Sequence, residues 1–306
     1  MHGWQGSSAV PAKLRSKLYS HPTLFEGWDL KSQNTPWPVP VYYQSLLILA
    51  YGVGCPPMDG TTKPAGPFRP ALIVVDMQED FCPPNGSLAV EGARSLAPLI
   101  NSLLSLPGFV FRAATLDFHP PDHVSFATNH PEPNNKPFES VVQVTNPSQP
   151  SETTIPQRLW PPHCIRDTPG SHIIPELDTS KIDLFVRKGL KKDVDMYSAF
   201  FDAFGNQDPV GSGSVSVDLT GALRERGVTD VFVVGVAGEY CVKFTAVDAV
   251  KVGFRTWVVE EGTRCVVPGR VWDEAREEMR GKGVGVVGVD GVEMGWVRGR
   301  QEEGYY

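Results

Sequence analysis

The sequence predicts an α/β protein with a single doubly wound sheet of about six mostly parallel strands, flanked by helices on both faces. The first observation behind this prediction is a set of short, continuously apolar runs, which are typical of strands buried on both faces. The second is their alternation with segments of helical periodicity, which indicates a parallel sheet. The third is that residues with carboxylate, lysine or imidazole side chains come after the apolar runs, at the carboxyl ends of the predicted strands. Open α/β sheets bind their ligands at these ends.

Composition narrows the class of protein. With 306 residues, 41% of them hydrophobic, the chain can bury a full core. Its formal charge of -7 and pI near 5.5 argue against a nucleic-acid or anionic-membrane partner, because binding a polyanion requires a basic face. No apolar run reaches about 18 residues, so we expect no membrane span. The absence of a Walker loop leaves a nucleoside triphosphate site without support.

The cysteines indicate the compartment. They are odd in number, widely spaced and without a CxxC pair: Cys55, Cys82, Cys164, Cys241 and Cys265. This pattern predicts free thiols in a reducing environment, hence an intracellular protein, most simply cytoplasmic, with the nucleus and the peroxisome left open.

The domain organisation follows from where structure-forming patterns begin. Residues 1–67 are polar and interrupted by prolines, with one apolar stretch at 41–53, and are predicted to be a disordered or non-core extension. Residues 68–306 are predicted to form one folded domain. Within it, the polar, proline-rich residues 131–158 are expected to form a surface excursion that partly roofs the site.

The first predicted strand, Ala71–Val75, is apolar at every position and places the Asp76 carboxylate at its carboxyl end. An ordinary loop or capping aspartate is the alternative interpretation. A long loop containing Phe81 follows, and the spacing of apolar residues predicts a helix over 92–106.

The second predicted strand, Phe109–Thr115, leads into Asp117 and His119. Residues at i and i+2 of an extended segment point to the same side, so these two side chains can share one ligand. His123, and His163 after the excursion, add imidazoles. A carboxylate and imidazoles from separate loops suit zinc, iron or manganese, although a solvated loop would show the same short pattern.

Two further strand ends carry candidate residues. The strand predicted at Ile182–Arg187 ends at Lys188, which can keep a neighbouring aspartate and cysteine ionised unless it is simply a solvated lysine. The aromatic segment Asp193–Phe204 begins with acidic residues expected to act as caps. A short helix is predicted over Leu219–Gly227.

The central stretch of the chain is Val231–Val252. It predicts a buried strand, a small-residue elbow and a helix that opens at Cys241. A thiol at a helix N-terminus is expected to favour the reactive thiolate, whereas the alternative is a small buried hydrophobic residue. The sheet is completed by a strand at Arg255–Glu260, a helix at Trp272–Gly281 and a strand at Gly283–Val289.

Five separated motifs together resemble one known family. They are ALIVVDMQEDFCPPNGSLAV, TLDFHPPDHVSFATNH, LWPPHC, VRKG and VVGVAGEYCVKFTAVDA, in the family's order and spacing. The sequence resembles the nicotinamidases (pyrazinamidases) of the isochorismatase-like cysteine hydrolases, whose fold is Rossmann-like, and the long excursion before LWPPHC is similar to the fungal members.

The resemblance implies roles for particular residues. It implies that Asp76, Lys188 and Cys241 form the catalytic trio. It also implies one divalent metal ion per chain, zinc before iron or manganese, bound by Asp117, His119 and His163, with His123 matching a histidine that is a ligand in only some members. The implied substrate pocket consists of Phe81, Trp160, Tyr197 and the Val236–Ala237 peptide, which is cis in the family and turns an N–H toward the substrate.

The implied reaction is hydrolysis of nicotinamide to nicotinate and ammonia through a cysteine thioester, in NAD salvage. Pyrazinamide is a plausible second substrate, and a homo-oligomer is compatible with the sequence. The alternatives are an amidohydrolase that uses metal-activated water, a sister hydrolase acting on another small amide, and a non-enzymatic sensor of such amides.

Overall fold

A computed structural model describes residues 63–149, 154–206 and 210–299 of the chain. Its centre is a sheet of six strands, all parallel, in the order β5-β2-β1-β6-β7-β8. All six predicted strands are therefore present: β1 Pro70–Val75, β2 Phe111–Asp117, β5 Leu184–Lys188, β6 Asp230–Gly235, β7 Arg255–Thr263 and β8 Val284–Val287. Of the extension predicted at residues 1–67, residues 1–62 lie outside the described residues.

Strands β1 and β6 form the middle of the sheet. Every residue of both strands is buried, as the apolar runs Ala71–Val75 and Val231–Val234 predict. They pair in register, with Val74 beside Val234. Because the strand order reverses direction between β1 and β6, the crevice at their carboxyl ends is the expected ligand site of a doubly wound sheet.

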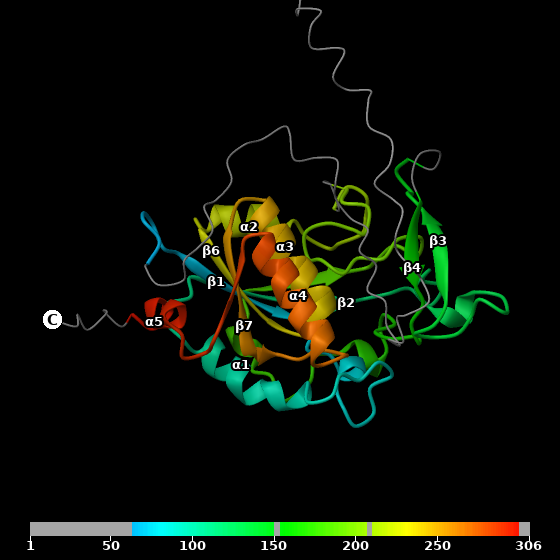
Figure 1. Cartoon of the computed structure of the whole chain (residues 1–306), viewed down its shortest axis with the longest axis horizontal. Coiled ribbons are helices and arrows are strands. Elements are labelled where there is room, and N and C mark those ends of the chain that lie inside the picture. The colour runs from blue at the N-terminus through cyan, green and yellow to red at the C-terminus, as the bar shows by residue number, and fades with distance from the viewer. Residues whose placement is uncertain (1–62, 150–153, 207–209, 300–306) are drawn as a thin grey trace, which may run out of the picture. The chain divides into compact units, whose positions relative to one another are not determined.

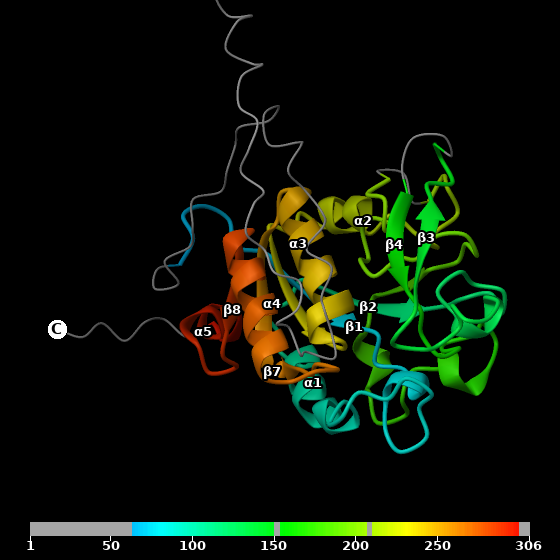
Figure 2. The same cartoon turned by 45° about the vertical axis from the view of Figure 1, so that its right-hand side comes forward.

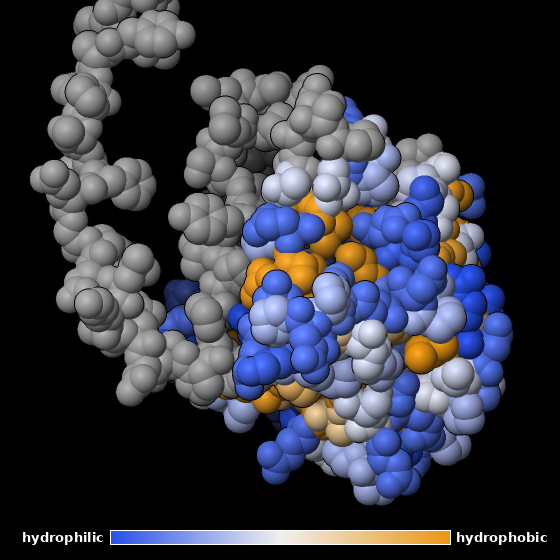
Figure 3. Space-filling view, turned by 90° about the vertical axis from the view of Figure 1, so that its right-hand side faces the viewer, coloured by the Kyte–Doolittle hydropathy of each residue, from blue (hydrophilic) through white to orange (hydrophobic). Residues whose placement is uncertain are grey.

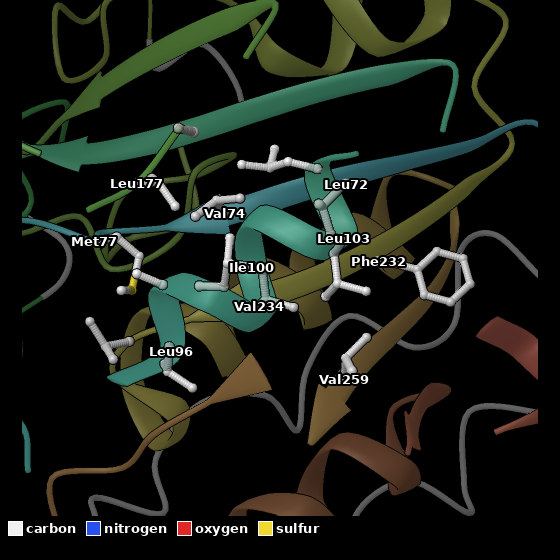
Figure 4. Packing of buried hydrophobic residues seen from close by; sticks show 14 of the residues in the cluster. Leu72, Val74, Met77, Leu96, Ile100, Leu103, Leu177, Phe232, Val234 and Val259 are labelled. Carbon is white, nitrogen blue, oxygen red and sulfur yellow. The ribbon is translucent and has the colours of Figure 1, made fainter. Parts of the chain in front are cut away.

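Helices cover both faces of the sheet, as predicted (Figures 1 and 2). One apolar cluster includes residues of α1 Ala97–Leu104 and α5 Val292–Arg298, and Figure 4 shows Ile100 of α1 beside Val74 of β1. A second cluster, on the other face, includes residues of α2 Leu219–Glu225, α3 Lys243–Lys251 and α4 Arg270–Gly281. Among the described residues, no helix is long and apolar enough to cross a bilayer.

Several predicted boundaries are wrong by a few residues. Strand β2 begins two residues later than expected, because Phe109 still belongs to a turn in which its N–H donates to the Leu106 carbonyl. The helix predicted over 92–106 is a short 3₁₀ turn followed by α1. The helix predicted to open at Cys241 also begins later: α3 starts at Lys243, and Tyr240 in the preceding turn has non-helical angles (φ -117, ψ -105).

The surface excursion contains structure that was not predicted. Strands β3 Val141–Thr145 and β4 Thr154–Arg158 pair antiparallel as a separate two-stranded sheet, which lies beyond β2 in both cartoon views (Figures 1 and 2). On the face that includes this hairpin, hydrophobic residues interrupt a mainly hydrophilic surface (Figure 3). Val141 is one of the exposed hydrophobic residues, at 48%.

Candidate active site

The predicted catalytic residues come together at the carboxyl ends of three strands. Asp76 directly follows β1, Lys188 is the last residue of β5, and Cys241 lies in the turn between β6 and α3. Asp76 has a left-handed φ of 50°, a conformation that aspartate tolerates better than most residues. Lys188 and Asp76 are completely buried and Cys241 is 6% exposed, so the trio is shielded from bulk water.

Lys188 contacts three side chains of the site, those of Asp76, Asp117 and Cys241. Its Nζ lies 2.9 Å from Asp76 Oδ2, donates a hydrogen bond to Asp117 Oδ1, and lies 3.5 Å from Cys241 Sγ. Burial alone would lower the pKa of Lys188, but the carboxylates of Asp117 and Asp76 outweigh it and raise that pKa well above its ordinary value. Lys188 is therefore held as a cation, and its complete burial rules out the solvated lysine that the sequence left open as the alternative.

The thiol of Cys241 differs from the expectation drawn from the sequence. Burial raises its pKa well above the ordinary value, and Asp76 and Asp117 raise it further, whereas Lys188 lowers it. The expected thiolate at a helix N-terminus is thus wrong for this resting arrangement, because two carboxylates lie near the sulfur and α3 begins two residues later. A neighbouring base must remove the thiol proton.

Asp76 is placed to be that base. Its carboxylate, that of Asp117 and the Cys241 sulfur offer atoms within 4.8 Å of one another. Burial raises the pKa of Asp76 and Lys188 opposes this, so the carboxyl is a stronger base than a solvated aspartate. Thr115, which sequence reasoning missed, donates from Oγ1 to Asp76 Oδ1 at 2.6 Å and leaves Oδ2 toward Lys188. Its position two residues before Asp117 on β2 was the available signal.

The predicted metal ligands also converge. Asp117, His119 and His163 offer ligand atoms within 4.8 Å of one another, and all three side chains are buried. Asp117 Oδ2 lies 3.5 Å from His119 Nε2 and 3.9 Å from His163 Nε2. Burial lowers the pKa of His163 to about 4, so this imidazole is neutral at physiological pH, as a metal ligand must be.

The hydrogen bonds behind these histidines fit a divalent metal ion. His119 Nδ1 lies 2.9 Å from the Gly189 carbonyl, and His163 Nδ1 lies 2.8 Å from the Pro161 carbonyl. Each carbonyl is an acceptor for a proton on Nδ1, and the Nε2 atom of each ring faces Asp117, which is the outer arrangement typical of metal-binding histidines. Gly189 has a φ of 66°, and a Cβ there would overlap the His119 ring, so glycine is required at this position.

His123 lies beside this group with both ring nitrogens already engaged. Its ring stacks on that of His119 with centroids 4.1 Å apart. Nδ1 lies 2.8 Å from Ser125 Oγ, and Nε2 lies 3.3 Å from the Val194 carbonyl. The side chain is fully buried, and burial lowers its pKa well below the ordinary value. His123 also offers a ligand atom within 4.8 Å of ligand atoms of His119 and Asp195, so it belongs to a second buried group that could hold a metal ion.

Aromatic side chains border the trio and the histidines. Phe81 packs against His163 with ring centroids 5.5 Å apart. Trp160 packs edge-on against Tyr240, the neighbour of Cys241, at 5.2 Å, and its Nε1 donates to the Tyr197 hydroxyl at 3.1 Å. The Val236–Ala237 peptide is cis and precedes the turn that carries Cys241. Phe81 thus contacts one of the histidines, while Trp160 and Tyr197 contact Tyr240, the residue before Cys241.

Asp195 and Gln157 were missed by sequence reasoning. The acidic residues at the start of 193–204 were expected to cap a helix, but no helix forms in that segment. Instead Asp195 is buried and accepts a hydrogen bond from Gln157 Nε2 at 3.0 Å. Gln157 belongs to β4 and also donates to the Tyr197 hydroxyl at 3.3 Å. The excursion therefore supports one wall of the site. The sign that Gln157 has a role is that it is a buried polar residue between more exposed neighbours on β4.

The arrangement supports nucleophilic acyl transfer. A buried thiol lies beside a carboxylate that can accept its proton, and a lysine compensates the charge of that carboxylate. A group of oxygen and nitrogen ligands suited to a divalent ion lies beside them. Aromatic walls suit a flat ring.

Comparisons with known proteins agree with this chemistry. The sequence profile of the isochorismatase domain matches residues 70–290. The nicotinamidase of Acinetobacter baylyi is 36% identical over 214 residues, which cover 70% of this chain and 90% of that protein. The structure of the yeast nicotinamidase bound to the inhibitor nicotinaldehyde matches with a TM-score of 0.65 and 33% identity, covering 72% of this chain and 99% of that one. The structure of the Pyrococcus horikoshii pyrazinamidase in complex with zinc matches with a TM-score of 0.54 and 30% identity, covering 72% and 99%.

Proposed function

Because this chain belongs to the isochorismatase family, we propose that it is a nicotinamidase, which hydrolyses nicotinamide to nicotinate and ammonia in NAD salvage. The observation that carries the proposal is the convergence of the Asp76, Lys188 and Cys241 side chains beside the Asp117, His119 and His163 group. The free thiols among the described residues support an intracellular location.

Acylation begins with proton transfer from the Cys241 thiol to Asp76. The sulfur attacks the carboxamide carbon, and the backbone N–H groups of Ala237 and Cys241 stabilise the oxyanion, each contributing about 3 kcal/mol as in other acyl-transfer sites. Asp76 then donates its proton to the departing ammonia, and a thioester remains on Cys241. Lys188 compensates the negative charge of Asp76 and of the sulfur throughout these steps.

Hydrolysis of the thioester uses the same carboxylate. Asp76 removes a proton from a water molecule, which attacks the thioester carbonyl, and the proton returns to the sulfur as nicotinate leaves. A single carboxylate can serve both half-reactions because burial holds its pKa above that of a solvated aspartate.

The substrate is held by groups outside the trio. Phe81 and Trp160 enclose the ring, and Tyr197 fixes the Trp160 indole through its hydroxyl group. A divalent metal ion bound by Asp117, His119 and His163 would supply a Lewis-acidic position for the ring nitrogen. Zinc is our first expectation, and iron and manganese suit the same donor set. Pyrazinamide has a similar flat ring and carboxamide, so we propose it as a second substrate, in line with the pyrazinamidase relative.

The test is ammonia release from nicotinamide by the purified, zinc-loaded full chain. Cys241→Ala should reduce turnover by at least about 10³-fold, because removing the nucleophile of a covalent hydrolase has effects of that order. Cys82→Ala is the matched control, since it removes another buried thiol that lies outside the catalytic trio. Mass spectrometry of the quenched wild type should show a nicotinoyl adduct on Cys241. Full turnover by Cys241→Ala would instead favour hydrolysis by metal-activated water.

A further inference from the structure

The backbone of Asp117 loses its neighbouring strand inside the site. Strand β1 ends at Val75, and its last contact with β2 is the hydrogen bond from the Asp76 N–H to the Thr115 carbonyl, at 3.2 Å. In a parallel sheet, alternate residues of a strand face the same neighbour, so Asp117 is the next residue that faces β1. Its N–H and carbonyl are buried where no strand continues, and unpaired buried backbone groups are costly.

The side chain of Gln78 takes the place of the missing strand. Its Oε1 accepts the Asp117 N–H at 2.8 Å, and its Nε2 donates to the Asp117 carbonyl at 2.8 Å. The second Nε2 hydrogen goes to the Ser171 carbonyl, at 2.9 Å. Gln78 is completely buried, and because both amide hydrogens face carbonyls, the amide has a single favourable orientation.

These bonds fix the residue that both parts of the site share. Asp117 directs Oδ1 to Lys188 and Oδ2 toward the two histidines. Ser171 lies in the segment that follows His163, and that segment is itself joined to the residues just after β2 by the bond from the His119 N–H to the Cys164 carbonyl. Gln78 therefore joins the end of β1, the Asp117 backbone and the segment after His163.

We propose that Gln78 is a positioning residue that holds the Asp117 carboxylate between Lys188 and the two histidines. It touches neither the substrate nor the reacting sulfur. Its effect on turnover rests on the proposed function, whereas its effect on metal affinity rests only on the bonds to Asp117. A backbone clamp of this kind acts on a metal site as an outer hydrogen-bond partner does, and loss of such a partner lowers metal affinity or activity by about 10- to 100-fold.

The experiment compares the full chain with Gln78→Glu and Gln78→Met. Gln78→Glu keeps the shape but replaces both N–H donors with an acceptor, and Gln78→Met removes all three bonds. Asp230→Asn is the control for general loss of stability, because it weakens a buried ion pair with Arg255 at the opposite end of β6. The readouts are Zn²⁺ affinity by calorimetry, the visible absorption of the Co²⁺-loaded protein, and kcat and KM for nicotinamide at saturating Zn²⁺.

Both Gln78 variants should bind Zn²⁺ about 10- to 100-fold more weakly, shift the Co²⁺ absorption bands and lower kcat, while Asp230→Asn changes only the unfolding midpoint. Unchanged Zn²⁺ affinity and Co²⁺ absorption in both variants would overturn the proposal, as would an equal loss of affinity in Asp230→Asn. If the wild type does not hydrolyse nicotinamide, the proposed function fails, but the Zn²⁺ and Co²⁺ results still decide the role of Gln78.

A measurement on the wild type covers the case in which neither variant folds. The Asp117 amide hydrogen should exchange with solvent as slowly as those of the central strand β1, because Gln78 Oε1 holds it. Rapid exchange at Asp117 beside slow exchange in β1 would show that the clamp is absent and would overturn the proposal.

Discussion

Asp117 and Lys188 join the two halves of the site through one hydrogen bond. They are register partners on β2 and β5, and Lys188 Nζ donates to Asp117 Oδ1 while Oδ2 lies 3.5 Å from His119 Nε2. One carboxylate therefore belongs both to the charge centre around Cys241 and to the candidate metal group. Changes at either residue should affect both parts.

Asp117→Asn tests this shared role. The carboxamide keeps the size of the side chain but removes the negative charge that faces Lys188 and the histidines. We expect Zn²⁺ affinity to fall by at least about 10-fold and turnover of the zinc-saturated protein to fall as well, because both functions use this charge. Calorimetry and ammonia release measure the two effects separately. Wild-type turnover at saturating Zn²⁺ would show that the bond to Lys188 has no catalytic role.

Lys188→Met should destabilise the fold more than a surface substitution. It leaves the carboxylates of Asp76 and Asp117 buried without their cation, and breaking a buried ion pair in this way typically costs about 3–5 kcal/mol. The double variant Lys188→Met/Asp76→Asn should recover part of that loss, because one of the unpaired charges is gone. Denaturant unfolding of the single and double variants measures the difference. A double variant as unstable as the sum of the single effects would contradict the coupling.

The sequence predicted the strands more accurately than the turns for physical reasons. A strand buried on both faces is almost continuously apolar, so the runs Ala71–Val75 of β1 and Val231–Val234 of β6 are evident from local composition. The start of α3 depends instead on the backbone angles of Tyr240, which no local pattern specifies.

Within the site, residues adjacent to strand ends were predictable and those joined by distant contacts were not. Asp76 and Lys188 lie at the ends of strands and Cys241 lies in the turn after β6, whereas Asp195 becomes part of the site through contacts with distant residues, Gln157 of the hairpin and the imidazoles of His119 and His123. The raised pKa of the Cys241 thiol likewise depends on burial and on two carboxylates from other strands. Sequence periodicity contains no information about these three-dimensional neighbours.

Tyr197→Phe tests whether the hairpin shapes the pocket. The change removes the hydroxyl that accepts hydrogen bonds from Trp160 Nε1 and Gln157 Nε2. It leaves the buried Trp160 Nε1 without this partner, whereas Gln157 Nε2 still donates to Asp195 and to the Arg158 carbonyl. We expect a stability loss of about 1–3 kcal/mol and a higher KM for nicotinamide with a smaller change in kcat. The double variant Trp160→Phe/Tyr197→Phe removes the orphaned indole donor and should be more stable than the sum of the single losses predicts. Strictly additive losses would mean that this hydrogen bond contributes nothing.

Removal of the metal ion should abolish turnover reversibly. After dialysis against a chelator we expect ammonia release to stop and to return when Zn²⁺, Fe²⁺ or Mn²⁺ is added, because an Asp/His₂ donor set accepts several such ions. Far-UV circular dichroism should be unchanged, since the sheet does not depend on this group. Full activity of a protein shown by elemental analysis to be metal-free would contradict the assignment.

The ion pair between Lys243 and Glu278, outside the candidate active site, should make the free energy of unfolding depend on pH. Lys243 in α3 is 4% exposed at its side chain, and its Nζ lies 2.7 Å from Glu278 Oε2 of α4. Burial would raise the pKa of Glu278, but the charges and hydrogen bonds of Lys243 and Lys282 outweigh it, so this pKa lies below its ordinary value. The contribution of the pair is therefore present above the ordinary pKa of a glutamate and is lost as the pH falls through the lowered pKa of the folded state.

Glu278→Gln should reduce the free energy of unfolding at pH 7 by about 1 kcal/mol, a modest value because the glutamate is partly exposed. Urea unfolding of both proteins from pH 7 down to pH 3 should show this difference shrinking as the pH falls, with ammonia release at pH 7 unaffected. A difference that stays constant over this range would mean that Glu278 stabilises the α3–α4 contact by packing and not by charge.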